Sequence, residues 1–332
     1  MLDGCRRAAR YNARRATLEK RVRVLNFAEL ATNIPAKIEY HIDRAHSYLL
    51  NGISRYRHPD ASAFYNELNG SGYNPNELID ALVQQKLIYI NVPKCASTSI
   101  KMILSSLVGR RVASFDQLHK RIYSGLRSPF QIGVSAFHRL ATDSATLRFS
   151  FVRNPYERLV SAWADKFQDR YLVAGDSFID KYLAHRNAID PSLPRGEHRM
   201  LTFADFVTYA TATASLRVDA HWQLQDDILN MPRLALDFIG RVETFARDIR
   251  RVLDHIGADQ RLRQAAVMPP HASPHHSWPL YYTQDLADRV YRAYERDFDR
   301  FGYPRAISFA PTNSAAAKYR AVIPALCMSS ER

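Results

Sequence analysis

A lysine and a run of hydroxyl side chains mark the first place in this sequence where chemistry could occur. The apolar run 87–92 predicts a buried strand, and the apolar spacing of 97–108 predicts an amphipathic helix directly after it. Lys94 lies in the loop between them, and the helix opens with Ser97, Thr98 and Ser99. A helix N-terminus offers unpaired N–H groups and a positive dipole, which favour a phosphate-like anion. The alternative is an ordinary hydroxyl cap beside a surface lysine.

A second strand-to-helix junction offers an arginine. The run 147–152 predicts another strand, and Arg153 follows it directly. The guanidinium of Arg153 can bind a phosphate through two parallel hydrogen bonds, and Ser161, farther along the following helix, can donate a hydroxyl to the same group. Arg158 and Asp165 share that helix face, and we interpret them as a solvated polar surface.

Local signals predict where this second helix begins. Asn154 has the type of an N-cap, Pro155 fits the first helical position, and Glu157 has the spacing of a capping box. A further strand is predicted over 235–239, followed by a helix over 245–256 that Gly257 closes.

A last amphipathic helix is predicted over 283–298, with two i,i+4 ion pairs, Asp285–Arg289 and Asp288–Arg292. Strands that alternate with helices predict an α/β fold whose mainly parallel sheet is flanked by helices. Ligands of such sheets bind at the carboxyl ends of the strands, where Lys94 and Arg153 both lie. We therefore expect the two cations at one edge.

Charge and composition limit the classes of protein that this sequence can encode. The formal net charge is +13, and the first 24 residues hold eight basic and two acidic residues. This arm is best interpreted as a solvated basic helix; a transit-like peptide or a nucleic-acid arm is the alternative. The three cysteines are too few and too dispersed for a disulfide framework or a four-cysteine zinc site, and no apolar run is long enough for a transmembrane helix.

Two longer motifs resemble those of a known family. VPKCASTSIK (92–101) is similar to the 5′-phosphosulfate-binding loop of the sulfotransferases, and FVRNPYERLVSAWADKF (151–167) is similar to their 3′-phosphate-binding motif. Both resemble most the carbohydrate sulfotransferase branch (sulfotransferase family 2 type), which includes Golgi chondroitin and heparan sulfate enzymes. Shorter similarities occur at 221–222, 238–244 and 297–303, so the resemblance spans about 86–304.

This resemblance implies a P-loop-nucleotide-kinase-like sulfotransferase fold and the donor substrate 3′-phosphoadenosine 5′-phosphosulfate (PAPS), without a metal. It implies that Lys94 contacts the bridging oxygen and the 5′-phosphate, with Ser97, Thr98 and Ser99 around it. It also implies that Arg153 and Ser161 hold the 3′-phosphate. The reaction expected is in-line transfer of a sulfuryl group to a hydroxyl, and we expect the acceptor to be a glycan. Positive charge near the breaking S–O bond would stabilise the transition state.

Transfer to a hydroxyl needs a proton acceptor. His138 is our first candidate, because it lies just before the Arg153 strand, in a position similar to that of the base histidine of the heparan sulfate 2-O branch. A histidine beside a phosphate pocket is suited to titrate near neutrality. His119, His221 or a carboxylate is the alternative, and His138 could instead be a core histidine.

The remaining motifs leave more than one interpretation. The loop 268–277 carries His271, Ser273 and His276, which could form a lid; it has no recognisable zinc-ligand spacing. Arg241 and Glu243 could face the acceptor or form a structural ion pair.

The expected organisation is a basic, helical or irregular extension (1–80), a sulfotransferase domain (86–304) and a peripheral tail (305–332). The Golgi members carry a membrane anchor, and secretory relatives carry cysteines after the segment that matches 221–222. The sequence has neither feature, so we expect a cytoplasmic protein, and a bacterial source.

Two other function classes compete with the transferase. A P-loop nucleotide kinase is disfavoured, because the loop at Lys94 lacks the Gly-Lys-Ser/Thr ending of a Walker A motif. A nucleic-acid-binding protein would use the basic first 24 residues and would show a steep salt dependence. We expect no nucleic-acid partner, and the sequence does not predict the oligomeric state.

Overall fold

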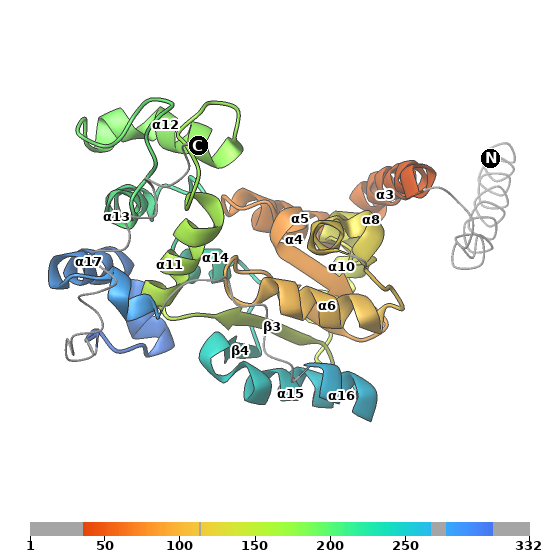
Figure 1. The fold of residues 1–332 in the computed structure, drawn as a ribbon. Coiled ribbons are helices and arrows are strands. Elements are labelled where there is room, and N and C mark those ends of the chain that lie inside the picture. Colours follow the sequence, from red (N-terminus) through yellow and green to blue (C-terminus); the bar gives the residue numbers. More distant parts are fainter. Residues whose placement is uncertain (1–35, 113, 267–276, 308–332) are drawn as a thin grey trace, which may run out of the picture.

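A four-stranded sheet lies at the centre of the computed structural model, which describes residues 36–112, 114–266 and 277–307 (Figure 1). The strands follow chain order: β1 (Ile79–Leu82), β2 (Leu87–Ile90), β3 (Leu147–Val152) and β4 (Phe238–Arg241). β1 pairs antiparallel with β2, and the other two pairings are parallel. The predicted α/β class with a mainly parallel sheet is therefore confirmed.

Two strands differ from the prediction. β1 begins within the stretch 1–80, for which the sequence predicted helical or irregular chain, and the sequence predicted no strand here. All four residues of β1 are buried and pair with β2, and the tight turn between the two strands contains Lys86 with φ 51°. The third predicted strand begins three residues later than 235–239. Asp237 fixes this start, because its carboxylate accepts hydrogen bonds from the backbone and guanidinium of Arg148 and so sets the register of Phe238 opposite Phe149.

Helices cover both faces of the sheet: Figure 1 shows α4, α6 and α10 on one side and α15 and α16 on the other. The described helices are α3 (Ala36–Arg57), α4 (Pro59–Gly70), α5 (Pro75–Leu78), α6 (Ser97–Leu107), α7 (Phe115–His119), α8 (Arg121–Ser124), α9 (Pro129–Ile132), α10 (Val134–Thr142), α11 (Pro155–Lys166), α12 (Ser177–Ile189), α13 (Phe203–Thr213), α14 (Gln225–Leu229), α15 (Phe245–His255), α16 (Gln260–Ala266) and α17 (Gln284–Phe301), with short 3₁₀ turns η1 (Val242–Thr244) and η2 (Trp278–Tyr281).

The apolar residues form two cores. One surrounds the sheet and includes the buried hydrophobic residues of the strands together with those of α6 and α15. The other is rich in aromatic side chains and lies among α11, α12, α13 and α17. Trp222 is fully buried in this second core, packs against Phe167, Phe206 and Tyr209, and donates its indole N–H to Thr213 Oγ1 at 3.1 Å. The chain around Trp222 is therefore held rigidly.

The predicted helix starts are confirmed with one exception. Asn154 caps α11 by accepting a hydrogen bond from the backbone N–H of Tyr156. The predicted capping box is wrong, because Glu157 pairs with Arg153 instead of returning to the Asn154 backbone. That backbone N–H donates to Glu243 at 2.6 Å, so a distant carboxylate replaces the local one.

In α17 the ion pair Asp285–Arg289 forms at 3.8 Å, as predicted. Asp288 instead accepts a hydrogen bond from Gln284 and lies 3.8 Å from Arg305.

The domain boundaries stay a prediction. Phe64 and Leu68 of α4 are buried in the same core as the sheet, and α4 packs against α10. The part of 1–80 that the structure describes is thus integrated with the sheet at this point.

Candidate functional site

The loop that contains Lys94 has an unusual backbone. Lys94 (φ 68°) and Ala96 (φ 58°) both adopt left-handed conformations, which non-glycine residues seldom do. Ala96 is the N-cap of α6 and offers no side-chain cap. The backbone N–H groups of Ser97, Thr98 and Ser99 in the first turn are therefore available to a ligand. These are the features of an anion-binding helix start.

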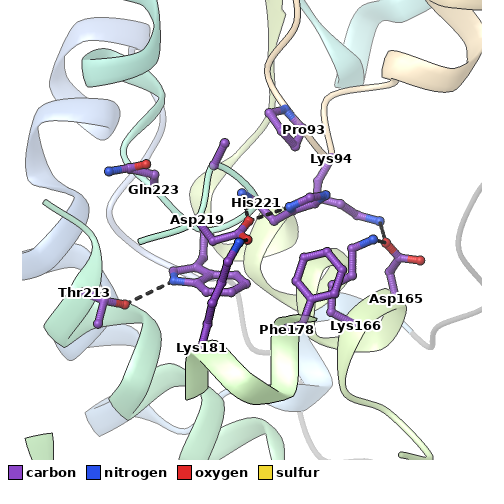
Figure 2. A network of polar contacts seen from close by, with 12 residues as sticks. Pro93, Lys94, Asp165, Lys166, Phe178, Lys181, Thr213, Asp219, His221 and Gln223 are labelled. Atoms are coloured by element: carbon purple, nitrogen blue, oxygen red, sulfur yellow. Dashed lines mark hydrogen bonds and ion pairs between the residues drawn. The ribbon is translucent and has the colours of Figure 1, made fainter. Parts of the chain in front are cut away.

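Lys94 is not a surface lysine. Only 14% of its side chain is exposed, and its ammonium lies 3.1 Å from Asp165, which also contacts Lys166 at 2.9 Å. Burial lowers the pKa of Lys94, and the Asp165 carboxylate partly offsets this effect. Burial would raise the pKa of Asp165, but the two ammonium groups outweigh it and bring that pKa to about 2. Figure 2 shows this contact between the Lys94 and Asp165 side chains.

Arg153 reaches the same loop from the neighbouring strand. β2 and β3 are adjacent and parallel, so their carboxyl ends meet at one edge. Arg153 Nη1 donates to the Lys94 carbonyl at 3.3 Å, and Nη2 contacts Glu157 at 2.7 Å. Its Nε is buried without a hydrogen-bond partner among the described residues. The structure therefore brings the two predicted cations together.

A buried glutamine, which the sequence analysis did not single out, joins the two junctions. The Gln225 side chain accepts from the Arg153 backbone N–H at 3.0 Å and donates to its carbonyl at 2.9 Å. Its oxygen also accepts from Cys95 Sγ at 3.2 Å. Asp297 of α17 fixes Gln225 in turn by accepting from the backbone N–H groups of Gln225 and Asp226. Burial raises the pKa of Asp297 to about 6 despite those bonds.

The interpretation of Arg158 as a solvated residue is wrong. Arg158 is 1% exposed, and its guanidinium donates to three backbone carbonyls: Pro93 at 3.1 Å, Gln223 at 2.5 Å and Ala220 at 2.6 Å. It thereby ties the Lys94 loop to the segment 220–223. Asp165 is 41% exposed in its side chain, but it pairs with Lys94 rather than facing solvent alone. Helical periodicity could not predict the partners of Arg158 and Asp165, because those partners lie on other segments of the chain.

A histidine and a carboxylate face this junction from the segment that Arg158 holds. His221 Nδ1 lies 2.6 Å from Asp219 Oδ1, and the His221 backbone N–H donates to the same oxygen at 2.9 Å. Asp219 also pairs with Lys181 of α12, and the Phe178 ring meets the His221 ring edge-on at 5.2 Å. Figure 2 shows His221 beside Lys94, with Phe178 and Lys166 close by.

The other predicted residues have different surroundings. Ser161 is 2% exposed within α11. His138 lies on α10, where its ring meets Phe64 of α4 edge-on at 5.1 Å. Burial lowers the pKa of His119, and Lys101 and Lys166 lower it further. None of the predicted roles is tested by this geometry, and His138 as the base stays a prediction.

Arg241 and Glu243 do not pair with each other among the described residues. Glu243 accepts from the Asn154 backbone N–H and from the Tyr303 hydroxyl, at 2.6 and 3.0 Å. Arg241 lies over the Tyr303 ring, 5.0 Å from its centroid. Both side chains thus hold the strand edge to the end of α17. His271, Ser273 and His276 lie outside the described residues, as does the basic N-terminal arm.

Comparisons with known proteins agree with the motifs. A model of the sulfotransferase family matches residues 80–304. The chain is 28% identical over 235 residues to human carbohydrate sulfotransferase 9, covering 66% of this chain and 52% of that protein. It is 27% identical over 248 residues to mouse carbohydrate sulfotransferase 11, covering 69% and 68%. The chain thus spans about half the length of the first relative and two thirds of the second. No solved structure matches.

Within 36–112, 114–266 and 277–307, no helix combines the length and the apolar character needed to cross a bilayer.

Proposed function

Because the chain belongs to the sulfotransferase family, we propose that it transfers a sulfuryl group from PAPS to a hydroxyl, with a carbohydrate as the acceptor. One observation carries the proposal: Lys94 and Arg153 come from adjacent parallel strands and lie in contact beside an α6 N-terminus that has no side-chain cap. Two phosphate-binding elements at one sheet edge suit a doubly phosphorylated nucleotide.

The residues present fit this donor. The unpartnered, buried Nε of Arg153 is a donor that an anion would satisfy. The first turn of α6 supplies backbone N–H groups, and Ser97, Thr98 and Ser99 supply hydroxyls. Lys94, Ser97, Thr98 and Ser99 would hold the 5′-phosphosulfate, and Arg153 with Ser161 the 3′-phosphate. Bound there, PAPS supplies the sulfuryl group.

Each residue has a distinct task in the proposed mechanism. Lys94 neutralises the charge that develops on the bridging oxygen, in a partly buried position where an ammonium acts more strongly than in water. To do so it exchanges its contact with Asp165 for the phosphate oxygens. Arg153 keeps the nucleotide in register, so that the reacting centre is positioned for in-line attack.

The carbohydrate acceptor rests on the names of the relatives, which are carbohydrate sulfotransferases at about 27% identity. The cytoplasmic location expected from the sequence stays a prediction.

The donor site is tested by thermal melting with adenosine 3′,5′-bisphosphate and with ATP. At about a hundred times its dissociation constant, a specific ligand stabilises the folded state by about 2.7 kcal/mol. We expect the bisphosphate to raise the melting temperature and Lys94→Gln to abolish most of that rise. Lys86→Gln is the matched control, because Lys86 also has a positive φ and lies just before β2, at the end opposite the Lys94 loop.

A rise with ATP and none with the bisphosphate would contradict the proposal and would favour a nucleotide kinase. Equal loss of the rise in the Lys94 and Lys86 variants would contradict the role of Lys94. A rise with RNA that disappears on deletion of residues 1–24 would favour the nucleic-acid alternative.

A further inference from the structure

We propose that His221, positioned by Asp219, is the general base that takes the proton from the acceptor hydroxyl. The inference rests on the proposed function and concerns the half of the site that the phosphate motifs do not describe. It is carried by the contacts of the segment 219–223, which Arg158 ties to the Lys94 loop.

The hydrogen bond to Asp219 selects the form of the ring that can act as a base. Asp219 Oδ1 can only accept at neutral pH, so Nδ1 at 2.6 Å carries the proton and donates it. Nε2 is then the nitrogen with the free electron pair, and it has no hydrogen-bond partner among the described residues. A carboxylate that orients a histidine in this way also stabilises the charge that the ring gains.

The ring is held in place from several sides. Trp222, the next residue, is fully buried and anchors the backbone. Phe178 meets the ring edge-on, and Lys181 fixes the second oxygen of Asp219. About a quarter of the His221 side chain (26%) is exposed, so a bound acceptor can reach it. This combination of fixed orientation and access is what a general base requires.

Burial of the His221 ring favours its neutral form. Burial lowers its pKa from 6.5, Asp219 opposes this shift, and Lys166 and Lys94 add to it. The titratable groups that face His221 from the surrounding elements are Asp219, Lys94, Lys166, Lys181 and His119. Because the pKa lies below its ordinary value, the ring is unprotonated at neutral pH and can accept a proton.

His138 lacks this arrangement. The His138 ring meets the Phe64 ring, and α10 packs against α3, α4, α9 and β2. No carboxylate orients its ring among the described residues. The order along the chain favoured His138, whereas the contacts favour His221.

In the proposed step, sulfuryl transfer and proton transfer occur together. The acceptor oxygen forms a bond to sulfur while its proton passes to His221 Nε2. The bond from sulfur to the bridging oxygen breaks, and its electron pair stays with adenosine 3′,5′-bisphosphate. Lys94 lies where that negative charge develops, and His221 releases the proton to solvent after the products leave.

The test measures transfer of radiolabelled sulfate from PAPS to a mixture of unsulfated chondroitin, desulfated heparin and dextran. We expect His221→Ala to lower kcat by about 100-fold or more, the range of a lost general base, while binding of adenosine 3′,5′-bisphosphate stays within about threefold of the parent. Added imidazole should restore part of the lost transfer. His255→Ala, at an exposed position on α15, is the matched control.

The pH profile separates a base from a merely structural residue. For the parent protein, kcat/KM should fall as the pH drops through the lowered pKa of His221, because protonation removes the base. For His221→Ala rescued by imidazole, the fall in kcat/KM should occur at the pKa of the added imidazole. It should shift to another pH when 4-methylimidazole replaces imidazole. Asp219→Asn should lower kcat more than it raises KM, because it disturbs the ring rather than the donor site.

Parent-like transfer by His221→Ala, or a loss that imidazole does not restore although the bisphosphate still binds, would overturn this inference alone. So would loss of transfer in His138→Gln together with retention in His221→Ala. A parent protein that neither binds the bisphosphate nor transfers sulfate would overturn the proposed function and the inference with it.

Discussion

The donor side and the base side of this site are built in different ways. On the donor side, Lys94 and Arg153 each follow a strand directly, and the parallel pairing of β2 with β3 brings them together. On the base side, Asp219 and His221 lie in an irregular segment whose position depends on Arg158, Trp222 and Lys181. The donor side is therefore a product of local pattern and sheet topology, whereas the base side depends on tertiary contacts.

This contrast explains why the donor side, but not the base side, can be predicted from the sequence. A strand, a cationic loop and a helix start are visible in the sequence because their periods and caps are local. A histidine that is oriented by a carboxylate two residues away produces no periodic pattern in the sequence. Its signal in the sequence is only the spacing of Asp219 and His221 beside a tryptophan.

The largest effect is expected at Arg158, which connects the two sides. Arg158→Lys leaves one ammonium where three buried carbonyls had a donor each, and a buried group without its partner costs about 1–3 kcal/mol. We expect a loss of about 3 kcal/mol in the free energy of unfolding, measured by urea denaturation.

Transfer should fall more than donor binding in this variant, because the segment 219–223 loses its link to the Lys94 loop. Arg139→Lys, an exposed change on α10, serves as the control. Unchanged stability and unchanged kcat in Arg158→Lys would show that the two sides are positioned independently.

A smaller effect is expected at Asp165, within the donor side. Its carboxylate competes with the donor for Lys94, from which it lies 3.1 Å away. Asp165→Asn removes this competition, and a pair that is 41% exposed on the acidic side is worth no more than about 1 kcal/mol. Calorimetric titration should therefore show adenosine 3′,5′-bisphosphate binding about two- to fivefold more tightly.

The control for Asp165→Asn is Asp143→Asn, since Asp143 pairs with Lys86 at 3.2 Å and lies near the opposite end of β2. Weaker binding in Asp165→Asn would mean that Asp165 orients Lys94 for the donor instead of competing with it.

Much of the fold could be predicted from the sequence. The strand at 147–152 and the helices α6 and α15 follow from apolar runs, the start of α11 from the Asn154 cap, and the end of α15 from Gly257. The alternation of strands and helices predicts the parallel pairings. β1 was missed because four buried residues that include Asp80 do not alternate. The capping box failed because Glu157 found Arg153 and left the Asn154 backbone to Glu243. Each miss reflects a partner from a distant part of the chain.

The candidate site divides in the same way. The sequence analysis predicted Lys94, Arg153 and the hydroxyl run as site residues, and they lie around the Lys94 loop and the start of α6. It could not predict the burial of Arg158 or the bridging role of Gln225, because both depend on backbone carbonyls and side chains from other elements.

In the proposed function Lys94 and Arg153 bind opposite ends of one nucleotide, so the protein should select its ligands by the 3′-phosphate. Calorimetric titration would compare adenosine 3′,5′-bisphosphate with adenosine 5′-monophosphate in the parent and in Arg153→Gln. A hydrogen bond to a charged group is worth about 1.5–3 kcal/mol. The parent should therefore prefer the bisphosphate by about 10- to 100-fold.

Arg153→Gln should lose most of that preference while retaining its affinity for the monophosphate. An undiminished preference for the bisphosphate in Arg153→Gln would show that Arg153 does not bind the 3′-phosphate.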